Sequence, residues 1–258
     1  MDVHTFSASK LKVACSNCNL RELCLPVGMS AGDLDKVEQL VSLRHTVKRG
    51  DSLFRIGDAF ESLYAVRAGF LKSSVVSGDG REQITGFHMS GELVGLDGIS
   101  TGKHACDTSA LEDTEVCVIP YRRIDEIATL VPALRGHFHR VMSREIVREH
   151  GVMLALGTMM AEERTATFLL NLSQRFEARG YSKREFVLRM TRAEIGNFLG
   201  LKLETVSRVL SRFARDGLLE VDQKRVRIVD AEGLRAVLNG RATCSTDRPA
   251  APKGSATS

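Results

Sequence analysis

The 258-residue sequence has no tryptophan, three tyrosines and five prolines. It also lacks long uncharged stretches. The longest one near its centre, 151–161, is far shorter than the roughly 20 apolar residues that a membrane span needs. The first twenty residues contain no continuous apolar segment of the kind that a secretory signal requires. We therefore expect a cytoplasmic protein that has no membrane partner.

The composition is that of a folded protein. Hydrophobic residues make up 43% of the chain and charged residues 26%, which excludes wholesale disorder. The length favours two domains or one large one. Because cytoplasmic thiols stay reduced, the six cysteines indicate metal or redox chemistry more than a disulfide framework.

Three of the cysteines lie close together near the start of the chain. Cys15, Cys18 and Cys24 form a C-x2-C-x5-C pattern, and thiolates are soft ligands that suit zinc or iron–sulfur clusters. Zinc sites usually combine two short segments that each carry two ligands, such as C-x2–4-C and H-x3–5-H. The sequence has no second segment of this kind. Three near ligands and a distant fourth resemble iron–sulfur ligation more closely. The alternative is that these are ordinary free cysteines.

Three other cysteines could supply the fourth ligand. Cys117 lies in a β-branched run that ends at Pro120 and predicts a strand, whereas Cys106 lies in a polar stretch that predicts a turn. A strand fixes a ligand more firmly than a loop, which favours Cys117, although ligation by Cys106 stays open. Cys244 belongs to the tail 241–258, which is rich in Ala, Ser and Thr and is expected to be disordered.

Glycine punctuates the first half of the chain. Ten of the 22 glycines lie between Gly50 and Gly102, among short apolar runs at 52–56, 63–66, 70–76 and 83–89. Short strands separated by glycine turns predict an antiparallel roll or sandwich. The glycine-rich segment 91–95 could cradle a phosphate, but a β-turn is the favoured interpretation.

A long helix is predicted from Pro132 to about residue 160, because proline suits the first turn of a helix. Its apolar seam predicts a two-stranded helix pair and therefore a homodimer. The alternative is a single amphipathic helix packed on its own domain. Glu149 interrupts the seam and would face its own copy in a parallel pair, which weakens the dimer. The seam residues are Met142, Ile146, Met153, Leu156 and Met160.

The second half predicts a winged helix-turn-helix. A helix over 162–179 is followed by a capping box at Thr191–Glu194, a turn at Gly200, a helix over 203–215 and a β-hairpin over 218–229. Residues 189–227 contain nine basic and five acidic side chains, which equals the net charge of +4 of the whole chain. Because phosphate contacts dominate non-specific affinity for DNA, this balance favours double-stranded DNA as the partner.

The second helix of this motif carries the expected base contacts. Arg208 can donate two hydrogen bonds to guanine, Glu204 can accept one from cytosine, and Ser207 can reach a base or a phosphate. Lys202 and Arg212 are expected to touch the DNA backbone. The other expected DNA contacts are Thr191 and Arg192.

Together these residues resemble the CRP/FNR family of transcription regulators, most closely its oxygen-sensing FNR branch. The resemblance extends from Cys15 to about Leu238 and includes "ITGFHMSGELVGLDGI", "MMAEERTATFLLNLSQRF" and "MTRAEIGNFLGLKLETVSRVL". It implies an α+β fold and no enzymatic activity. The implied parts are a cysteine-rich cluster-binding segment (1–30), a cyclic-nucleotide-binding-like β-roll (31–131), a dimerisation helix (132–160), a winged helix-turn-helix (161–240) and a tail (241–258).

The resemblance also implies a cofactor and a switch. A [4Fe–4S] cluster would be held by Cys15, Cys18, Cys24 and Cys117. It would promote dimerisation and binding to a palindrome of the type TTGAT–four bases–ATCAA when oxygen is scarce. Oxygen would convert the cluster to a [2Fe–2S] form and loosen the dimer. Contacts with RNA polymerase are expected from loops near Thr85–Gly86 and Ser182–Arg184.

Two other functions were weighed. A cyclic-nucleotide-responsive regulator of the same fold would resemble a pattern in which Gly-Glu is followed by Arg-Ser or Arg-Thr, but the stretch 103–107 has no arginine to bind a phosphate. An iron–sulfur or thiol enzyme with an attached DNA-binding module would need acid–base partners. His88 and His104 have no nucleophile or carboxylate at a recognisable spacing, and we interpret them as structural.

Overall fold

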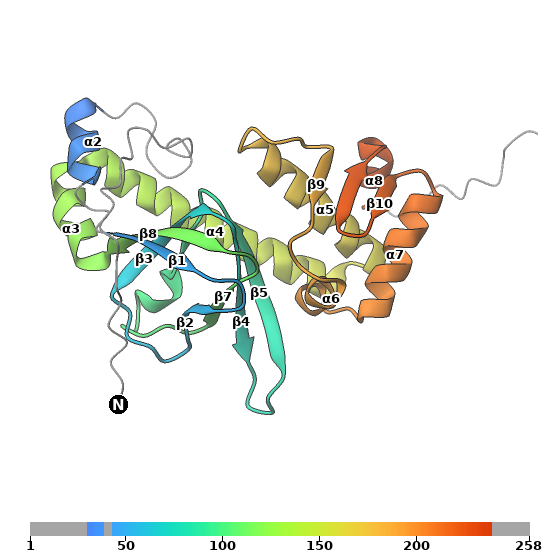
Figure 1. Cartoon of the computed structure of the whole chain (residues 1–258), viewed down its shortest axis with the longest axis horizontal. Coiled ribbons are helices and arrows are strands. Elements are labelled where there is room, and N and C mark those ends of the chain that lie inside the picture. Colours follow the sequence, from blue (N-terminus) through green and yellow to red (C-terminus); the bar gives the residue numbers. More distant parts are fainter. Residues whose placement is uncertain (1–29, 39–42, 239–258) are drawn as a thin grey trace, which may run out of the picture.

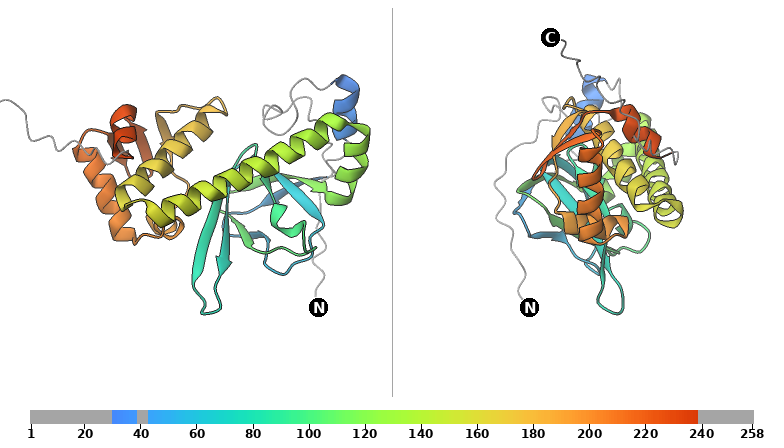
Figure 2. Two further views of the ribbon diagram at one scale, coloured as in Figure 1. Left: turned by 180° about the vertical axis from the view of Figure 1, so that it is seen from behind. Right: turned by 90° about the vertical axis from the view of Figure 1, so that its right-hand side faces the viewer.

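The computed structural model describes residues 30–38 and 43–238 (Figure 1). A β-roll occupies one end of the molecule and a smaller helical domain the other, and one long helix connects them (Figure 2). This arrangement confirms the predicted α+β class with a β-roll and a winged helix-turn-helix. The predicted segment 1–30 and tail 241–258 lie almost entirely outside the described residues.

The β-roll consists of two four-stranded antiparallel sheets. Each of the four apolar runs predicted as a strand lies in one of them. In the first sheet the strand order is β1 (Leu43–Val47), β8 (Thr114–Pro120), β3 (Ser62–Ala68) and β6 (Leu93–Val94). In the second it is β2 (Ser52–Phe54), β7 (Asp107–Ala110), β4 (Phe70–Val76) and β5 (Glu82–Met89). A short 3-10 helix, η1 (Leu96–Gly98), follows β6.

The side chains between these two sheets form the core of the roll. They include Val47, Phe54, Leu71 and Val116, all at most 5% exposed. Successive side chains of a strand point to opposite faces of a sheet. The neighbours of Val116 on β8 therefore point away from this core.

Three helices lie outside the roll (Figure 1). They are α2 (Ala31–Glu38), α3 (Tyr121–Leu130) and α4 (Pro132–Thr158). The strand β8 leads directly into α3, which packs against β3 and β8. Proline occupies the first turn of α4, as predicted.

The predicted dimerisation helix ends two residues earlier than expected. Thr158 is the last residue of α4, and Met159 and Met160 have extended backbone angles before α5 (Ala161–Glu177) begins. Met160 therefore caps α5, and it is not the last helical residue of the seam. The reason is the side chain of Glu163, which accepts a hydrogen bond of 2.6 Å from the Met160 N–H and starts a new helix there.

An arginine that the sequence pattern did not single out holds this corner. The Arg164 guanidinium donates to the backbone oxygens of Met159, Leu156 and Leu199, at 2.9, 2.8 and 2.9 Å. A cation suits this place because helix C-terminal carbonyls carry partial negative charge. Arg164 thus joins the end of α4 to the end of α6 (Arg192–Leu199).

The helical domain contains the predicted winged helix-turn-helix. The helix predicted at 203–215 is α7, with those bounds, and the hairpin that follows it is the wing. The strand order in the wing sheet is β10–β11–β9. Besides α6 and α7, the elements of this domain are α5 (Ala161–Glu177), β9 (Glu185–Val187), β10 (Leu219–Asp222), β11 (Arg225–Ile228) and α8 (Ala231–Val237).

A buried carboxylate joins the roll to the helical domain. Glu92 lies in the turn before β6. It accepts hydrogen bonds from Arg175 of α5 (2.7 and 3.0 Å) and from Arg179, two residues beyond the end of α5 (2.6 Å). Arg148 of α4 lies 3.7 Å away. Burial alone would raise the pKa of Glu92, but the arginines, first Arg175, lower it to about 2.

Replacing Glu92 by glutamine should destabilise the chain by about 2–4 kcal/mol at pH 7, because it leaves neighbouring buried guanidinium groups without their carboxylate. Since folding depresses the Glu92 pKa from 4.5 to about 2, its contribution is complete above pH 4.5 and is lost as the pH falls towards 2. Denaturant unfolding across this range tests the prediction, with Glu126→Gln on the exposed surface of α3 as control. If the difference in the free energy of unfolding between wild type and variant stayed constant down to pH 2, the prediction would be contradicted.

Candidate nucleic-acid interface and sensor site

Helix α6 begins at the predicted capping box and ends at the predicted glycine. The Thr191 hydroxyl accepts a hydrogen bond from the Glu194 N–H (3.1 Å), and Glu194 accepts one from the Thr191 N–H (2.8 Å). Gly200 ends α6 with φ of 63°, in the left-handed region. A Cβ at Gly196 would lie 2.6 Å from the Leu201 oxygen, so α6 and α7 approach closely at this point.

One face of α7 is buried and the opposite face is open. Val206, Val209, Leu210 and Phe213 pack into the domain core. Of the predicted base contacts, Glu204 and Arg208 are exposed and Ser207 is half-buried. Lys202, a predicted backbone contact, is exposed and caps the start of α7.

Three further predicted DNA contacts already have partners in the chain. Arg212 pairs with Glu162 at 3.1 Å, and Thr191 forms the capping box. Arg192 is half-buried and donates a hydrogen bond of 3.0 Å to the Gln223 oxygen in the wing turn. Burial lowers the pKa of Arg192. Arg192 therefore fixes the wing against α6, and no local pattern around Arg192 predicts this role.

A basic hollow of about 520 Å3 runs along α7 beside the start of α5. Its lining includes Arg208, Arg212, Arg215 and the hydroxyl of Ser211. Arg215 was not among the predicted contacts, although its position in the last turn of α7 marks it as a candidate phosphate contact.

The predicted seam is partly open in the single chain. On α4, Ile146 is 52% exposed and Met153 69%, whereas Met142 and Leu156 are half-buried. Glu149 is exposed among them, and Met160, just beyond α4, is 72% exposed. Val147 and Leu154 add to this apolar surface. Exposed apolar patches of this kind mark interaction surfaces, which favours the helix pair over a helix packed only on its own domain.

Cys117 lies on β8, as predicted, and faces away from the core of the roll. The preceding residue, Val116, is fully buried between the sheets, and Cys117 alternates to the outer face, where it is half-buried. Arg44 of β1 is its register partner, so the two side chains share that face. The Arg44 guanidinium also lies 3.4 Å from Glu115, so its positive charge is shared between that carboxylate and a thiolate at Cys117.

Cys106 directly precedes β7 of the second sheet and is half-buried. Its side chain packs against the core between the sheets, and its thiol donates to Asp97 at 3.5 Å. Burial, together with the Asp97 charge, raises the pKa of Cys106 to about 12. A thiol that stays protonated is a poor metal ligand.

The other predicted ligands, Cys15, Cys18 and Cys24, and Cys244 of the tail lie outside the described residues. Within residues 30–38 and 43–238 no group of three His, Cys, Asp or Glu side chains is placed to hold a metal ion. Of the predicted ligands, the described residues include Cys117 alone. Its position on the outer face of β8 fits the role of a cluster ligand.

The two histidines considered for catalysis are built into the roll. His88 is buried and shares a hydrogen bond of 2.9 Å with Ser73. Burial lowers the pKa of His88 to about 3, so it is neutral at pH 7. His104 stacks on Phe54 with ring centres 3.7 Å apart. Both have the structural surroundings that the sequence interpretation assigned to them.

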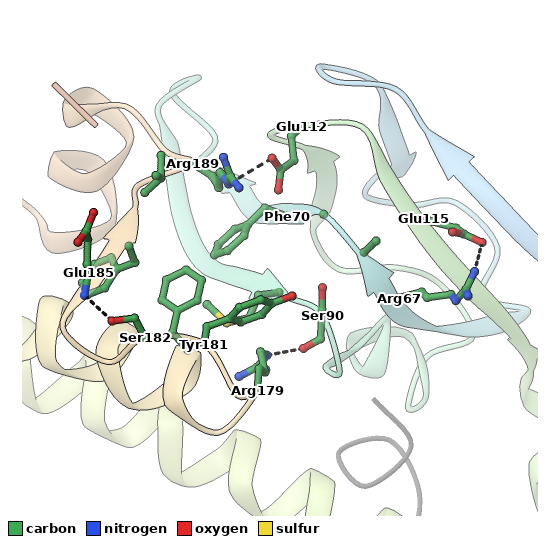
Figure 3. Close-up of a pocket in the computed structure, with 16 residues that line it drawn as sticks. Arg67, Phe70, Ser90, Glu112, Glu115, Arg179, Tyr181, Ser182, Glu185 and Arg189 are labelled. Carbon is green, nitrogen blue, oxygen red and sulfur yellow. Dashed lines mark hydrogen bonds and ion pairs between the residues drawn. The ribbon is translucent and has the colours of Figure 1, made fainter. Parts of the chain in front are cut away.

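Two of the hollows beside the β-roll have few unpaired charges. The larger, about 680 Å3, lies between the roll and the helical domain (Figure 3), and its charges are paired, as Arg67 is with Glu115 at 2.9 Å and Arg189 with Glu112 at 3.2 Å. In the other, between the roll and α4, Arg148 is the one lining arginine in the described part of the chain, and it pairs with Glu145. Neither hollow offers a free arginine for a cyclic phosphate.

Of the two loops expected to touch RNA polymerase, one is a loop and one is not. Ser182–Arg184 lie in the connection between α5 and β9. Thr85 and Gly86 lie within strand β5, where the pairing with β4 shifts by one residue, so their prediction as a loop is wrong. The hairpin turns earlier, at 77–81, where Ser77 and Arg81 close it.

Both domains match known protein families. Residues 44–129 match the cyclic nucleotide-binding domain and residues 163–237 the Crp-like helix-turn-helix domain. The chain is 50% identical over 226 residues to the transcriptional activator protein FnrA of Stutzerimonas stutzeri, covering 88% of this chain and 93% of that protein. It is 42% identical over 225 residues to the fumarate and nitrate reduction regulatory protein of Salmonella typhimurium, covering 87% and 90%.

A solved structure has the same architecture. FixK2 from Bradyrhizobium japonicum superposes with a TM-score of 0.69 at 28% identity, covering 74% of this chain and 94% of that one. None of the helices in the described residues has the length and apolar character needed to cross a membrane.

Proposed function

Because the chain belongs to the CRP/FNR family of transcription regulators, which are DNA-binding proteins and not enzymes, we propose that it is an oxygen-responsive regulator of genes for anaerobic metabolism. It acts in the cytoplasm as a homodimer and binds a palindromic operator of the TTGAT–four bases–ATCAA type when oxygen is scarce. At promoters it contacts RNA polymerase, with the loop Ser182–Arg184 as one contact region.

The position of Cys117 is the observation that carries the sensing part of the proposal. Its thiol lies on the outer face of β8 beside Arg44, whereas the half-buried Cys106 packs against the core between the sheets. Cys117 would hold a [4Fe–4S] cluster together with Cys15, Cys18 and Cys24. When bound, that cluster supplies an oxygen-labile centre, and the strand fixes one ligand within the sheet that leads directly into α3 and α4.

The exposed face of α7 carries the DNA-binding part. Arg208, Glu204 and Ser207 read base edges, and Lys202, Arg212, Thr191 and Arg192 lie at the predicted positions around them. Two copies of α7 are needed for a palindrome, and the open seam on α4 supplies the surface through which two chains pair.

A binding titration on two duplexes tests the function. The chain purified without oxygen should bind a duplex carrying the palindrome at least about 30-fold more tightly than one with a single base pair changed in each half-site, because each mismatch costs ~1–3 kcal/mol. Equal affinity for both duplexes would contradict the proposal.

Glu149 is expected to limit dimerisation. In a parallel pair its carboxylate faces its copy at the seam, where like charges repel. Replacing Glu149 by alanine should therefore shift the cluster-free chain towards the dimer, by about tenfold in the dissociation constant, which equals about 1.4 kcal/mol.

Sedimentation of the cluster-free chain measures this shift. Glu126→Ala removes the same charge from the exposed surface of α3 and serves as the matched control. If the Glu149 variant remained as monomeric as the wild type, charge repulsion would not be what keeps the dimer weak.

A further inference from the structure

The first helix of the helix-turn-helix is fastened to the edge of the β-roll. Strand β5 is the last strand of its sheet, so its outward backbone groups lack a neighbouring strand. Asn197 of α6 takes that place. Its Oδ1 accepts a hydrogen bond from the Ile84 N–H at 2.5 Å, and its Nδ2 donates to the Glu82 oxygen at 2.8 Å.

The roll also reaches back to α6. The Gln83 side chain donates to the backbone oxygen of Asn197 at 2.7 Å. Lys72 of β4 pairs with Glu194 at 3.2 Å. Partners from both domains thus meet at this junction. We call the four residues Asn197, Gln83, Lys72 and Glu194 the α6–β5 clasp.

An aromatic group supports the clasp from behind. Phe198, next to Asn197, lies with its ring centre 5.2 Å from that of Phe87 in β5 and 5.9 Å from that of Phe168 in α5. Such aromatic contacts stabilise beyond their buried area. The carboxamide of Asn197 thus sits at the rim of a packed junction, where its two hydrogen bonds fix orientation.

The clasp leaves both working surfaces open. The seam of α4 and the reading face of α7, with Glu204 and Arg208, are exposed while the clasp is closed. The closed clasp therefore leaves pairing through α4 and base reading by α7 sterically free.

A palindrome sets a strict requirement on this arrangement. The two recognition helices of a dimer must lie about 34 Å apart to enter successive major grooves. Only Met159 and Met160 separate α4 from α5, and rotation about such a short hinge would move α7 relative to the dimer axis. The contacts of Glu92 with Arg175 and the bonds of Arg164 already cross this hinge. The α6–β5 clasp adds an attachment on α6 itself, the helix next to α7.

Building on the operator binding proposed above, we propose that Asn197 is a positioning residue. Through the α6–β5 clasp it holds the helix-turn-helix against the roll, so that the two α7 helices of a dimer match one spacing of half-sites. Asn197 touches no base, and it determines which spacing is bound and not which sequence.

The test is a set of palindromes with spacers of three, four, five and six bases, bound by the full chain purified without oxygen. The wild type should prefer one spacer clearly. Asn197→Ala should bind that duplex about tenfold more weakly, as expected from the loss of hydrogen bonds, and should discriminate less among the spacers. Its response to a base change within a half-site should stay that of the wild type.

Two further variants and a hydrogen-exchange measurement serve as controls. Gln83→Ala, at an exposed site, should act in the same direction with a smaller effect and cannot be dismissed as misfolded. Gln174→Ala removes an exposed amide from α5 and should change nothing. Hydrogen exchange of the Ile84 amide should accelerate in Asn197→Ala, because that N–H loses its acceptor.

The outcomes separate this inference from the proposed function. A wild type that binds one spacer preferentially, with an Asn197→Ala variant that keeps the same affinity and preference, overturns the role of Asn197 alone. An Asn197→Ala variant that bound the palindrome more tightly would show that the clasp opposes DNA binding, and it would also overturn the role of Asn197. A wild type that prefers no palindrome would contradict the proposed function.

Discussion

Serine in place of Cys117 is expected to yield a chain that, purified without oxygen, contains almost no iron and lacks the visible absorbance of an iron–sulfur cluster. The hydroxyl of serine is a hard ligand and does not replace a soft thiolate on iron. Operator affinity should fall with the cluster, to the level of non-specific binding. Iron analysis of the purified chain gives the result independently of any DNA measurement.

The matched control is Cys106→Ser. Cys106 packs in the core between the sheets, and its raised pKa keeps the thiol protonated, so this variant should keep its iron. A Cys117 variant that retained iron, together with a Cys106 variant that lost it, would reverse the ligand assignment.

Alanine in place of Arg208 is expected to weaken operator binding by ~1–3 kcal/mol, or about five- to 150-fold. Arg208 is exposed on the reading face of α7 and can donate two hydrogen bonds to one guanine. The variant should therefore lose its preference for that base pair while still discriminating at the others. Titrations against duplexes changed at each half-site position measure this directly.

Lys202→Ala provides the contrast. A phosphate contact carries no sequence information, so this variant should weaken binding to all duplexes equally and lower the salt dependence by about one released ion. If Arg208→Ala showed that uniform loss instead, Arg208 would be a phosphate contact and not a base contact.

Features with a local cause were predictable from the sequence. The capping box at Thr191 marks the start of α6, and the glycine at 200 marks the turn before α7. The apolar spacing of Val206, Val209 and Phe213 predicts α7 itself. The β-branched run around Cys117 identified β8. In each case residues within a few positions of one another determine the structure.

Features that depend on distant partners were not predictable. Asn197 meets Glu82 and Ile84 across more than a hundred positions, and no helical pattern distinguishes it from a surface asparagine. Arg164 and Arg192 bind backbone oxygens whose positions follow from the tertiary fold. The loop near Thr85 is expected from the family resemblance alone, whereas the apolar run 83–89 predicts the strand that the structure has. The β-bulge at Thr85 follows from the pairing of β5 with β4.

The central claim is that the chain binds its operator only while an oxygen-labile cluster is intact. The most direct measurement combines iron and sulfide analysis of the anaerobically purified chain with operator titrations before and after exposure to air. We predict about four iron and four sulfide ions per chain, as a [4Fe–4S] cluster requires, with tight binding that is lost in air. A colourless, iron-free chain that binds the palindrome equally well in air would contradict the account.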